Sequence, residues 1–161
     1  MDAFLIDGCF GSTGGDFLCF GAGGSGKEMT LHLITKKVPA DRPKRFVSVN
    51  RSQGRLDGMQ AMVESLETDI KVEYIQIADP QINDQILAGM PDGMVVVNAT
   101  GMGKDTPASP VTDAGVFPRP GCWGAANLTL TTRKRNTVHL STGFSKMSAN
   151  SCPRGANFPS G

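Results

Sequence analysis

The sequence predicts an α/β fold in which a partial parallel β-sheet is followed by an irregular C-terminal tail. Short apolar runs alternate with amphipathic stretches up to residue 98, a pattern typical of strands joined by helices. A glycine-rich turn separates the first strand from the first helix. All 15 acidic residues lie in 1–113, whereas the last 48 residues hold six basic residues and no acid. We therefore expect a connector (1–15), an α/β unit (16–118) and an irregular basic tail (119–161), the tail being disordered or read from another frame.

The composition narrows the class of protein before any motif is considered. A chain of 161 residues suits one small domain, or one domain with a tail. No apolar run approaches the ~18–20 residues of a membrane span, and the start of the chain lacks a basic secretory segment. We expect a cytoplasmic chain with no membrane partner. The cysteines (Cys9, Cys19, Cys122 and Cys152) have no metal-binding spacing, so free thiols and no metal site are expected.

Four strands are predicted from apolar runs that end in polar or glycine residues. The first run, DFLCF, is continuously apolar and stops at Gly21, as expected for a strand buried on both faces. The second and fourth runs, RFVSVN and MVVVN, end in Asn50 and Asn98. The third, IKVEYIQI, alternates between polar and apolar residues. The predicted strands are 16–20, 45–50, 70–77 and 94–98.

Three helices are predicted between these strands. The segment 55–66 places its apolar residues three and four positions apart, which indicates one buried helical face. The segment 27–37 mixes apolar and charged residues, and 80–90 begins with a proline, as helices often do. Strands that alternate with helices form parallel sheets with right-handed crossovers.

The turn after the first strand matches the spacing G-x-G-x-x-G. In a dinucleotide-binding turn, the first glycine permits a tight turn, the second admits a pyrophosphate, and the third lets the helix pack on the strand. The helix then directs its free amides and positive dipole end at the phosphates. Because the motif lies between a predicted strand and helix, we expect a Rossmann-like dinucleotide site, with a purely structural turn as the alternative. Its residues are Gly21, Ala22, Gly23, Gly24, Ser25 and Gly26.

The end of the second strand indicates which dinucleotide is bound. NAD-binding units carry an acid here that holds the ribose 2′-hydroxyl. This chain instead has Asn50, Arg51 and Ser52, with Arg55 one turn later. Arginine pairs with phosphate through a planar fork, so the segment favours NADP over NAD. The alternative is a pair of surface arginines at a helix start, where positive charge is unfavourable.

Three segments together resemble the cofactor domain of shikimate dehydrogenases and quinate/shikimate dehydrogenase-like proteins. They are GAGGSG, VNRS with Arg55, and VVNATGMGKDTPASPVTD, and the resemblance covers about 16–118. It implies reversible hydride transfer between a shikimate-like hydroxy acid and NADP. By position, the glycine turn would hold the pyrophosphate, and Asn50 to Ser52 with Arg55 would hold the 2′-phosphate. The ribose and nicotinamide side would be lined by Asn98, Ala99, Thr100, Gly101 and Met102.

The chain departs from that family at both ends. The family places its substrate domain, with a catalytic Lys and Asp, before the glycine turn, whereas only 20 residues precede Gly21 here and none is Lys. No catalytic residue is therefore assigned, and a hydroxy-acid substrate is expected only if a catalytic domain is supplied. After Trp123 the family's Tyr segment and final helix are missing. We interpret the chain as a fragment or a frameshifted product.

Two other functions remain open from the sequence. The chain could be a non-catalytic NADP-binding module or remnant. It could also be the cofactor domain of another dehydrogenase, such as a glutamyl-tRNA reductase-like enzyme, which shares the N-R-[ST] strand end. The basic cluster 133–135 has no aromatic residues among it, so no nucleic-acid partner is expected. A sheet of only four strands would leave an edge open to association with another chain.

Overall fold

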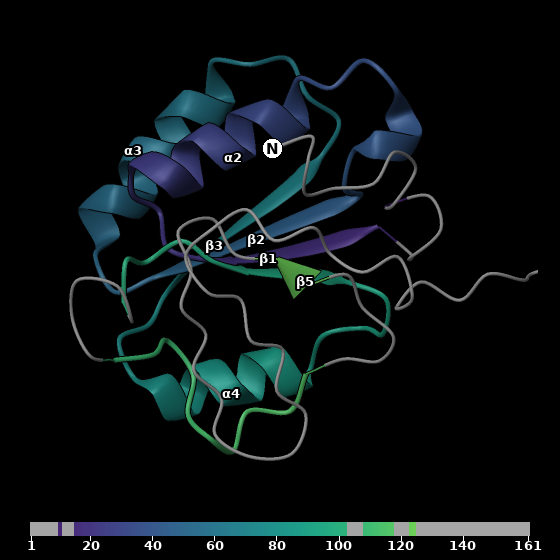
Figure 1. The fold of residues 1–161 in the computed structure, drawn as a ribbon. Helices are drawn as coiled ribbons and strands as arrows, with labels where there is room; N and C mark the ends of the chain where they lie inside the picture. The colour runs from purple at the N-terminus through teal and green to yellow at the C-terminus, as the bar shows by residue number, and fades with distance from the viewer. Residues whose placement is uncertain (1–9, 11–14, 103–107, 118–122, 125–161) are drawn as a thin grey trace, which may run out of the picture.

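The computed structural model describes residues 10, 15–102, 108–117 and 123–124 (Figure 1). These residues form a parallel sheet with the strand order β3-β2-β1-β4-β5. The strands are β1 (Asp16–Phe20), β2 (Arg45–Asn50), β3 (Lys71–Gln76), β4 (Val95–Asn98) and β5 (Trp123–Gly124). The α-helices of this part of the chain are α2 (Gly24–Ile34), α3 (Gln53–Glu64) and α4 (Pro80–Ala88). A short 3₁₀ helix, η1, spans Pro39–Asp41.

The helices form a layer on each face of the sheet, as Figure 1 shows. The chain steps from β1 to β2 to β3 in one direction, with α2 and α3 on one face. It then returns past β1 to β4, and right-handed crossovers place α4 on the opposite face. The predicted α/β, Rossmann-like arrangement is confirmed. The strand order also creates a switch point between β1 and β4, where open α/β sheets bind ligands.

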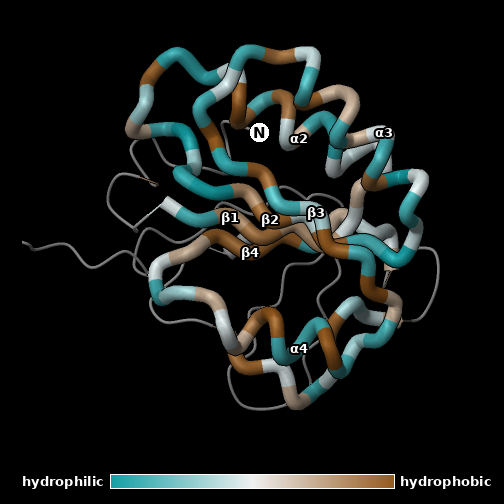
Figure 2. Tube along the Cα trace, turned by 180° about the vertical axis from the view of Figure 1, so that it is seen from behind, coloured by the Kyte–Doolittle hydropathy of each residue, from teal (hydrophilic) through white to brown (hydrophobic). Residues whose placement is uncertain are grey.

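Each face of the sheet carries its own hydrophobic core, because side chains alternate along a strand. Phe17 and Cys19 of β1 pack under α2 and α3, whereas Leu18 and Phe20 face α4. Figure 2 shows the same arrangement as a band of hydrophobic strands between helices that turn polar residues outward. The rings of Phe17 and Phe46 stack with centroids 4.8 Å apart. The central strands are therefore buried on both sides, as their continuous apolar runs predicted.

Phe10 belongs to this core although it lies in the predicted connector. Its side chain is only 2% exposed, and its ring lies 6.1 Å from that of Phe17. The sequence offered no periodic pattern around Phe10 from which this packing could be predicted.

The four predicted strands and three predicted helices are all present, with shifted helix ends. Helix α2 begins inside the glycine turn, three residues before the predicted start, because glycines 24 and 26 take helical conformation. Two apolar side chains of the predicted helices are exposed, Leu31 at 40% and Ile82 at 41%. The fifth strand pairs Val96 with Trp123 and was not predicted, because two residues carry no period. The basic cluster 133–135 and three cysteines lie outside the described residues, namely Cys9, Cys122 and Cys152.

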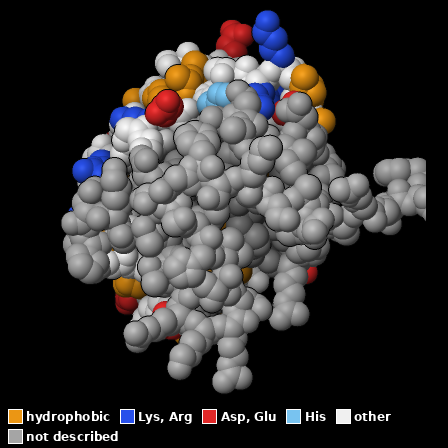
Figure 3. All heavy atoms as spheres, in the orientation of Figure 1, with side chains coloured by type: hydrophobic (Ala, Val, Ile, Leu, Met, Phe, Trp, Pro, Cys, Tyr) orange, Lys and Arg blue, Asp and Glu red, His pale blue; other side chains and the backbone are white. Residues whose placement is uncertain are grey.

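Along the upper rim of the face shown in Figure 3, acidic and basic side chains of the described residues lie near one another. None of the helices in the described ranges is long and apolar enough to cross a membrane.

Candidate functional site

The glycine turn links the carboxyl end of β1 to the start of α2. Gly21 has φ +115°, a conformation that L side chains rarely adopt. A Cβ on Gly21 would also lie 2.6 Å from the carbonyl carbon and oxygen of Ala99. A Cβ on Gly26 would overlap the carbonyl oxygen of Gly21. The first and third glycines are therefore required by close backbone contacts within the fold itself.

The middle of the turn has a different environment. A Cβ on Gly24 would meet no atom within 4 Å, and one on Gly23 would meet only the Arg55 side chain, at 3.5 Å. The first backbone bond of α2 runs from the Lys27 amide to the Gly23 carbonyl, so the amides of Gly24, Ser25 and Gly26 precede the helical ladder. Helix α2 has no side-chain cap and no acid in its first turn. This end of α2 is therefore open to an anion.

Two buried residues, one in the turn and one just before it, hold the turn against the core. The Ala22 side chain is fully buried and packs with Leu56 and Met59 of α3, so it does not face a ligand. The Cys19 thiol donates to the Gly21 carbonyl at 3.3 Å. Burial raises the pKa of the Cys19 thiol to about 12, so it remains a neutral donor. Both residues act on the shape of the turn.

The carboxyl end of β2 forms a second turn beside the first. The Asn50 amide is 8% exposed and donates to the Ser52 carbonyl at 3.1 Å, so its side chain shapes this turn. Ser52 is the N-cap of α3, but its side chain makes no capping bond. Helix α3 also lacks an acid in its first turn. Its first amides, like those of α2, point to a site that favours negative charge.

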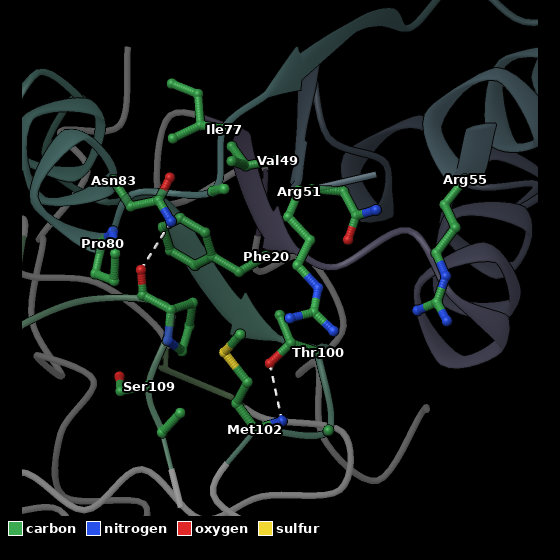
Figure 4. Close-up of a pocket in the computed structure, with 15 residues that line it drawn as sticks. Phe20, Val49, Arg51, Arg55, Ile77, Pro80, Asn83, Thr100, Met102 and Ser109 are labelled. Atoms are coloured by element: carbon green, nitrogen blue, oxygen red, sulfur yellow. Dashed lines mark hydrogen bonds between the residues drawn. The ribbon is translucent and has the colours of Figure 1, made fainter. Parts of the chain in front are cut away.

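Arg51 and Arg55 are the charged side chains at this place. Both are exposed, and in the described part of the chain neither takes part in an ion pair. Arg51 extends from the end of β2 toward Thr100 and Met102 (Figure 4). The Nη1 atom of Arg55 lies 3.5 Å from where a Cβ would stand on Gly23. Arg55 thus brings a positive charge to the glycine turn as well as to the α3 end.

The end of β4 completes the edge next to β1. The Ala99 amide donates to the Phe20 carbonyl at 2.6 Å, which extends the β1–β4 ladder to the turn. The buried Asn98 side chain accepts from the Thr100 amide at 3.0 Å and from its hydroxyl at 2.6 Å. The Met102 amide in turn donates to the Thr100 hydroxyl at 3.1 Å (Figure 4). This chain of bonds fixes the backbone at the predicted ribose and nicotinamide side.

These strand ends enclose a pocket of about 320 Å³. That volume is at the lower end of the ~300–1,000 Å³ typical of small-molecule sites, so it suits one end of a dinucleotide. The walls come from the ends of β1, β2 and β3, the start of α4, the turn after β4 and the segment 108–110 (Figure 4). The pocket lining is Phe20, Val49, Asn50, Arg51, Arg55, Ile77, Ala78, Pro80, Asn83, Thr100, Gly101, Met102, Ala108, Ser109 and Pro110.

The lining has a distinct electrostatic character. Among its described residues, Arg51 and Arg55 are the charged groups, and no carboxylate, lysine or histidine is included. The described part of the chain also contains no cluster of three or more side chains able to hold a metal ion. The site therefore suits an anionic organic ligand.

The structure brings six of the sequence-predicted residues into this pocket. They are Asn50, Arg51, Arg55, Thr100, Gly101 and Met102. The glycine turn adjoins the pocket through Arg55. Asn98 supports the pocket indirectly, because its side chain accepts a hydrogen bond from the amide of Thr100, a lining residue, and Ala99 lies between the two in the chain. Sequence reasoning missed the contributions of Ile77, Pro80, Asn83 and Ser109. Ile77 ends a predicted strand, and Pro80 and Asn83 lie in the first turn of a predicted helix, so their positions offered a signal, since parallel strands end at one edge. Ser109 lies in a loop and offered none.

No protein-family model matches the chain, and no curated protein is significantly similar to it in sequence. Among solved structures, the backbone is similar to that of the ligand-free form of 5-ketofructose reductase of Gluconobacter sp. strain CHM43. The two chains are 17% identical over 70% of this chain and 36% of that one, with a TM-score of 0.46. The present chain thus corresponds to about a third of that protein's length.

Proposed function

We propose that the chain is the NADP(H)-binding part of an oxidoreductase of the shikimate dehydrogenase type. The glycine turn would receive the pyrophosphate on the amides of Gly24, Ser25 and Gly26. Arg51, Ser52 and Arg55 would receive the adenosine 2′-phosphate. The turn from Asn98 to Met102 would line the ribose and, beyond this pocket, the nicotinamide side.

One observation carries this proposal. Two arginines without carboxylate partners in the described residues lie where β2 ends, next to a glycine turn and at the start of α3. An isolated positive charge at a helix N-terminus is unfavourable unless an anion neutralises it. The 2′-phosphate of NADP(H) would supply that anion, and NAD(H) has no phosphate at this position. The preference for NADP(H) is therefore the part of the proposal that these residues address most directly.

The reaction would require a further part of the enzyme. Bound NADP(H) supplies the hydride acceptor or donor, and the chain's own residues hold and orient it. A substrate hydroxyl also needs a group that takes up or returns its proton. The described lining offers no carboxylate, lysine or histidine for that step. Turnover of a hydroxy acid such as shikimate would depend on a second domain or chain, and without it this chain would act as a binding module.

Substitution of the two arginines tests the proposal. Charge-assisted hydrogen bonds contribute about 1.5–3 kcal/mol each, or roughly ten- to hundredfold in affinity. We expect Arg51→Gln and Arg55→Gln each to weaken NADPH binding by about tenfold or more while changing NADH binding by less than about threefold. Nicotinamide fluorescence titrations of the full chain would give both dissociation constants.

Arg42→Gln provides a matched control. Arg42 lies in the loop before β2, at the opposite end of this strand from the pocket. Its side chain pairs with Asp69 at 3.0 Å. Its removal changes net charge equally and should leave the ratio of NADPH to NADH affinity unchanged. An equal loss for both dinucleotides in the Arg51 and Arg55 variants would contradict the assigned role.

A further inference from the structure

Helix α4 places an amide side chain on its buried face, where apolar residues are usual. Asn83 is only 5% exposed and lies one helical turn before the fully buried Leu87. Its Nδ2 atom donates to the Pro110 carbonyl at 2.8 Å. Its Oδ1 atom is buried and has no hydrogen-bond partner among the described residues. A buried acceptor without a donor is unfavourable, so its retention needs an explanation.

The orientation of this amide is determined by chemistry. The Pro110 carbonyl can only accept a hydrogen bond, so the NH₂ end of Asn83 must face it. The oxygen must then face away from Pro110, as Figure 4 shows. Asn83 lines the pocket, and its buried Oδ1 atom is the acceptor of this side chain that lacks a donor.

The surroundings suggest which donor fits. Phe20, Val49, Ile77 and Pro80 give the pocket apolar walls beside Asn83 (Figure 4). A flat, mostly apolar ring that carries an exocyclic amino group satisfies every one of these features.

We propose that Asn83 is a specificity residue that recognises the adenine base of the cofactor. Its Oδ1 atom accepts a hydrogen bond from the exocyclic 6-amino group, while its Nδ2 atom stays on Pro110. The proposal rests on the proposed function, because it assumes that a dinucleotide occupies this site. It predicts discrimination against a base with a carbonyl at position 6, since two acceptors would then face each other.

Comparison of NADPH with its hypoxanthine analogue tests this directly. The analogue replaces the 6-amino group by a carbonyl oxygen and carries a proton on N1, so it differs from NADPH at this edge of the base alone. We expect the wild-type chain to bind NADPH about tenfold more tightly than the analogue, given the cost of an unpaired buried group. In Asn83→Ala this ratio should fall to within about threefold of unity.

The ratio separates base recognition from a purely structural role. If Asn83 only anchored the segment at Pro110, Asn83→Ala would weaken both ligands equally and leave the ratio unchanged. Gln85→Ala, at an exposed position of the same helix, should retain the wild-type ratio. A wild-type chain that prefers NADPH over NADH but not over the hypoxanthine analogue would overturn this inference alone. A wild-type chain that binds no dinucleotide would overturn the proposed function and this inference with it.

Discussion

Gly21 and Gly24 have opposite structural demands although both belong to one short motif. Gly21 combines positive φ with backbone contacts to Ala99 and Thr100, whereas a side chain on Gly24 would meet open space. The fold therefore requires glycine at positions 21 and 26. At positions 23 and 24 the absence of a side chain leaves open space beside the turn. The spacing predicts a tight turn at Gly21 and close helix packing at Gly26, and a side chain at either position would meet backbone atoms.

This contrast gives a prediction for stability. Gly21→Ala should lower the free energy of unfolding by about 2–4 kcal/mol, because left-handed backbone is strained for alanine and the Cβ overlaps Ala99. Gly24→Ala is the matched control and should change it by less than about 0.5 kcal/mol. Urea unfolding followed by circular dichroism measures both values. Similar losses in the two variants would mean that the turn does not have this conformation.

Arg51 and Arg55 could be predicted as cofactor residues from the sequence, because arginines stand where an NAD-binding unit would carry an acid after its second strand. The role of Ala22 was not visible in this way. Its place in the motif suggested a ligand contact, but its side chain packs with Leu56 and Met59 of α3. The difference arises because a motif describes a backbone path, whereas the direction of each side chain depends on the helices packed around it.

At the scale of elements, α4 shows where sequence reasoning reaches its limit. Its apolar residues are Ile82, Ile86 and Leu87, yet Ile82 is 41% exposed and Asn83 is buried. A helix of nine residues has too few turns for its apolar pattern to fix its rotation against the sheet. The existence of the helix was predictable, and the residue it directs into the pocket was not.

The start of α4 is fixed by a capping residue whose effect is measurable. The Asp79 carboxylate accepts from the Gln81 amide at 2.9 Å, and Pro80 follows at the first helical position. Asp79→Ala should lower the free energy of unfolding by about 0.5–2 kcal/mol, whereas Asp79→Asn, which can still cap, should retain most of it. Equal destabilisation of the two variants in urea titrations would show that capping is not the reason for this residue.

Helix α4 also binds the segment 108–112, whose residues 108–110 line the pocket. The Asp84 carboxylate accepts from the amide of Thr112 at 2.9 Å and from its hydroxyl, while Val111 packs on the α4 face of the sheet. These contacts join residues 28 positions apart in the chain. The sequence showed only a loop rich in glycine and proline here, because pairing of this kind follows no local period.

At the scale of the whole molecule, strand order decides where the ligand site lies. Four predicted strands with connecting helices indicated a parallel sheet, and the observed order places β1 between β2 and β4. The glycine turn, the arginines and the Asn98 turn are at least 25 residues apart in sequence but meet at one edge of the sheet. The chain thus gathers its candidate cofactor residues through topology, and Phe10 shows that the segment before β1 adds to its core.

Binding of NADP(H) at this edge of the sheet is measurable on the chain itself. The purified chain is titrated with NADPH and separately with NADH, while nicotinamide fluorescence and melting temperature are followed together. We expect saturable NADPH binding with a dissociation constant at least about tenfold lower than that for NADH. We also expect a rise in melting temperature, since a ligand at one hundred times its Kd stabilises by about 2.7 kcal/mol. A folded chain that shows no saturation with NADPH, or equal affinity for both dinucleotides, would contradict this account.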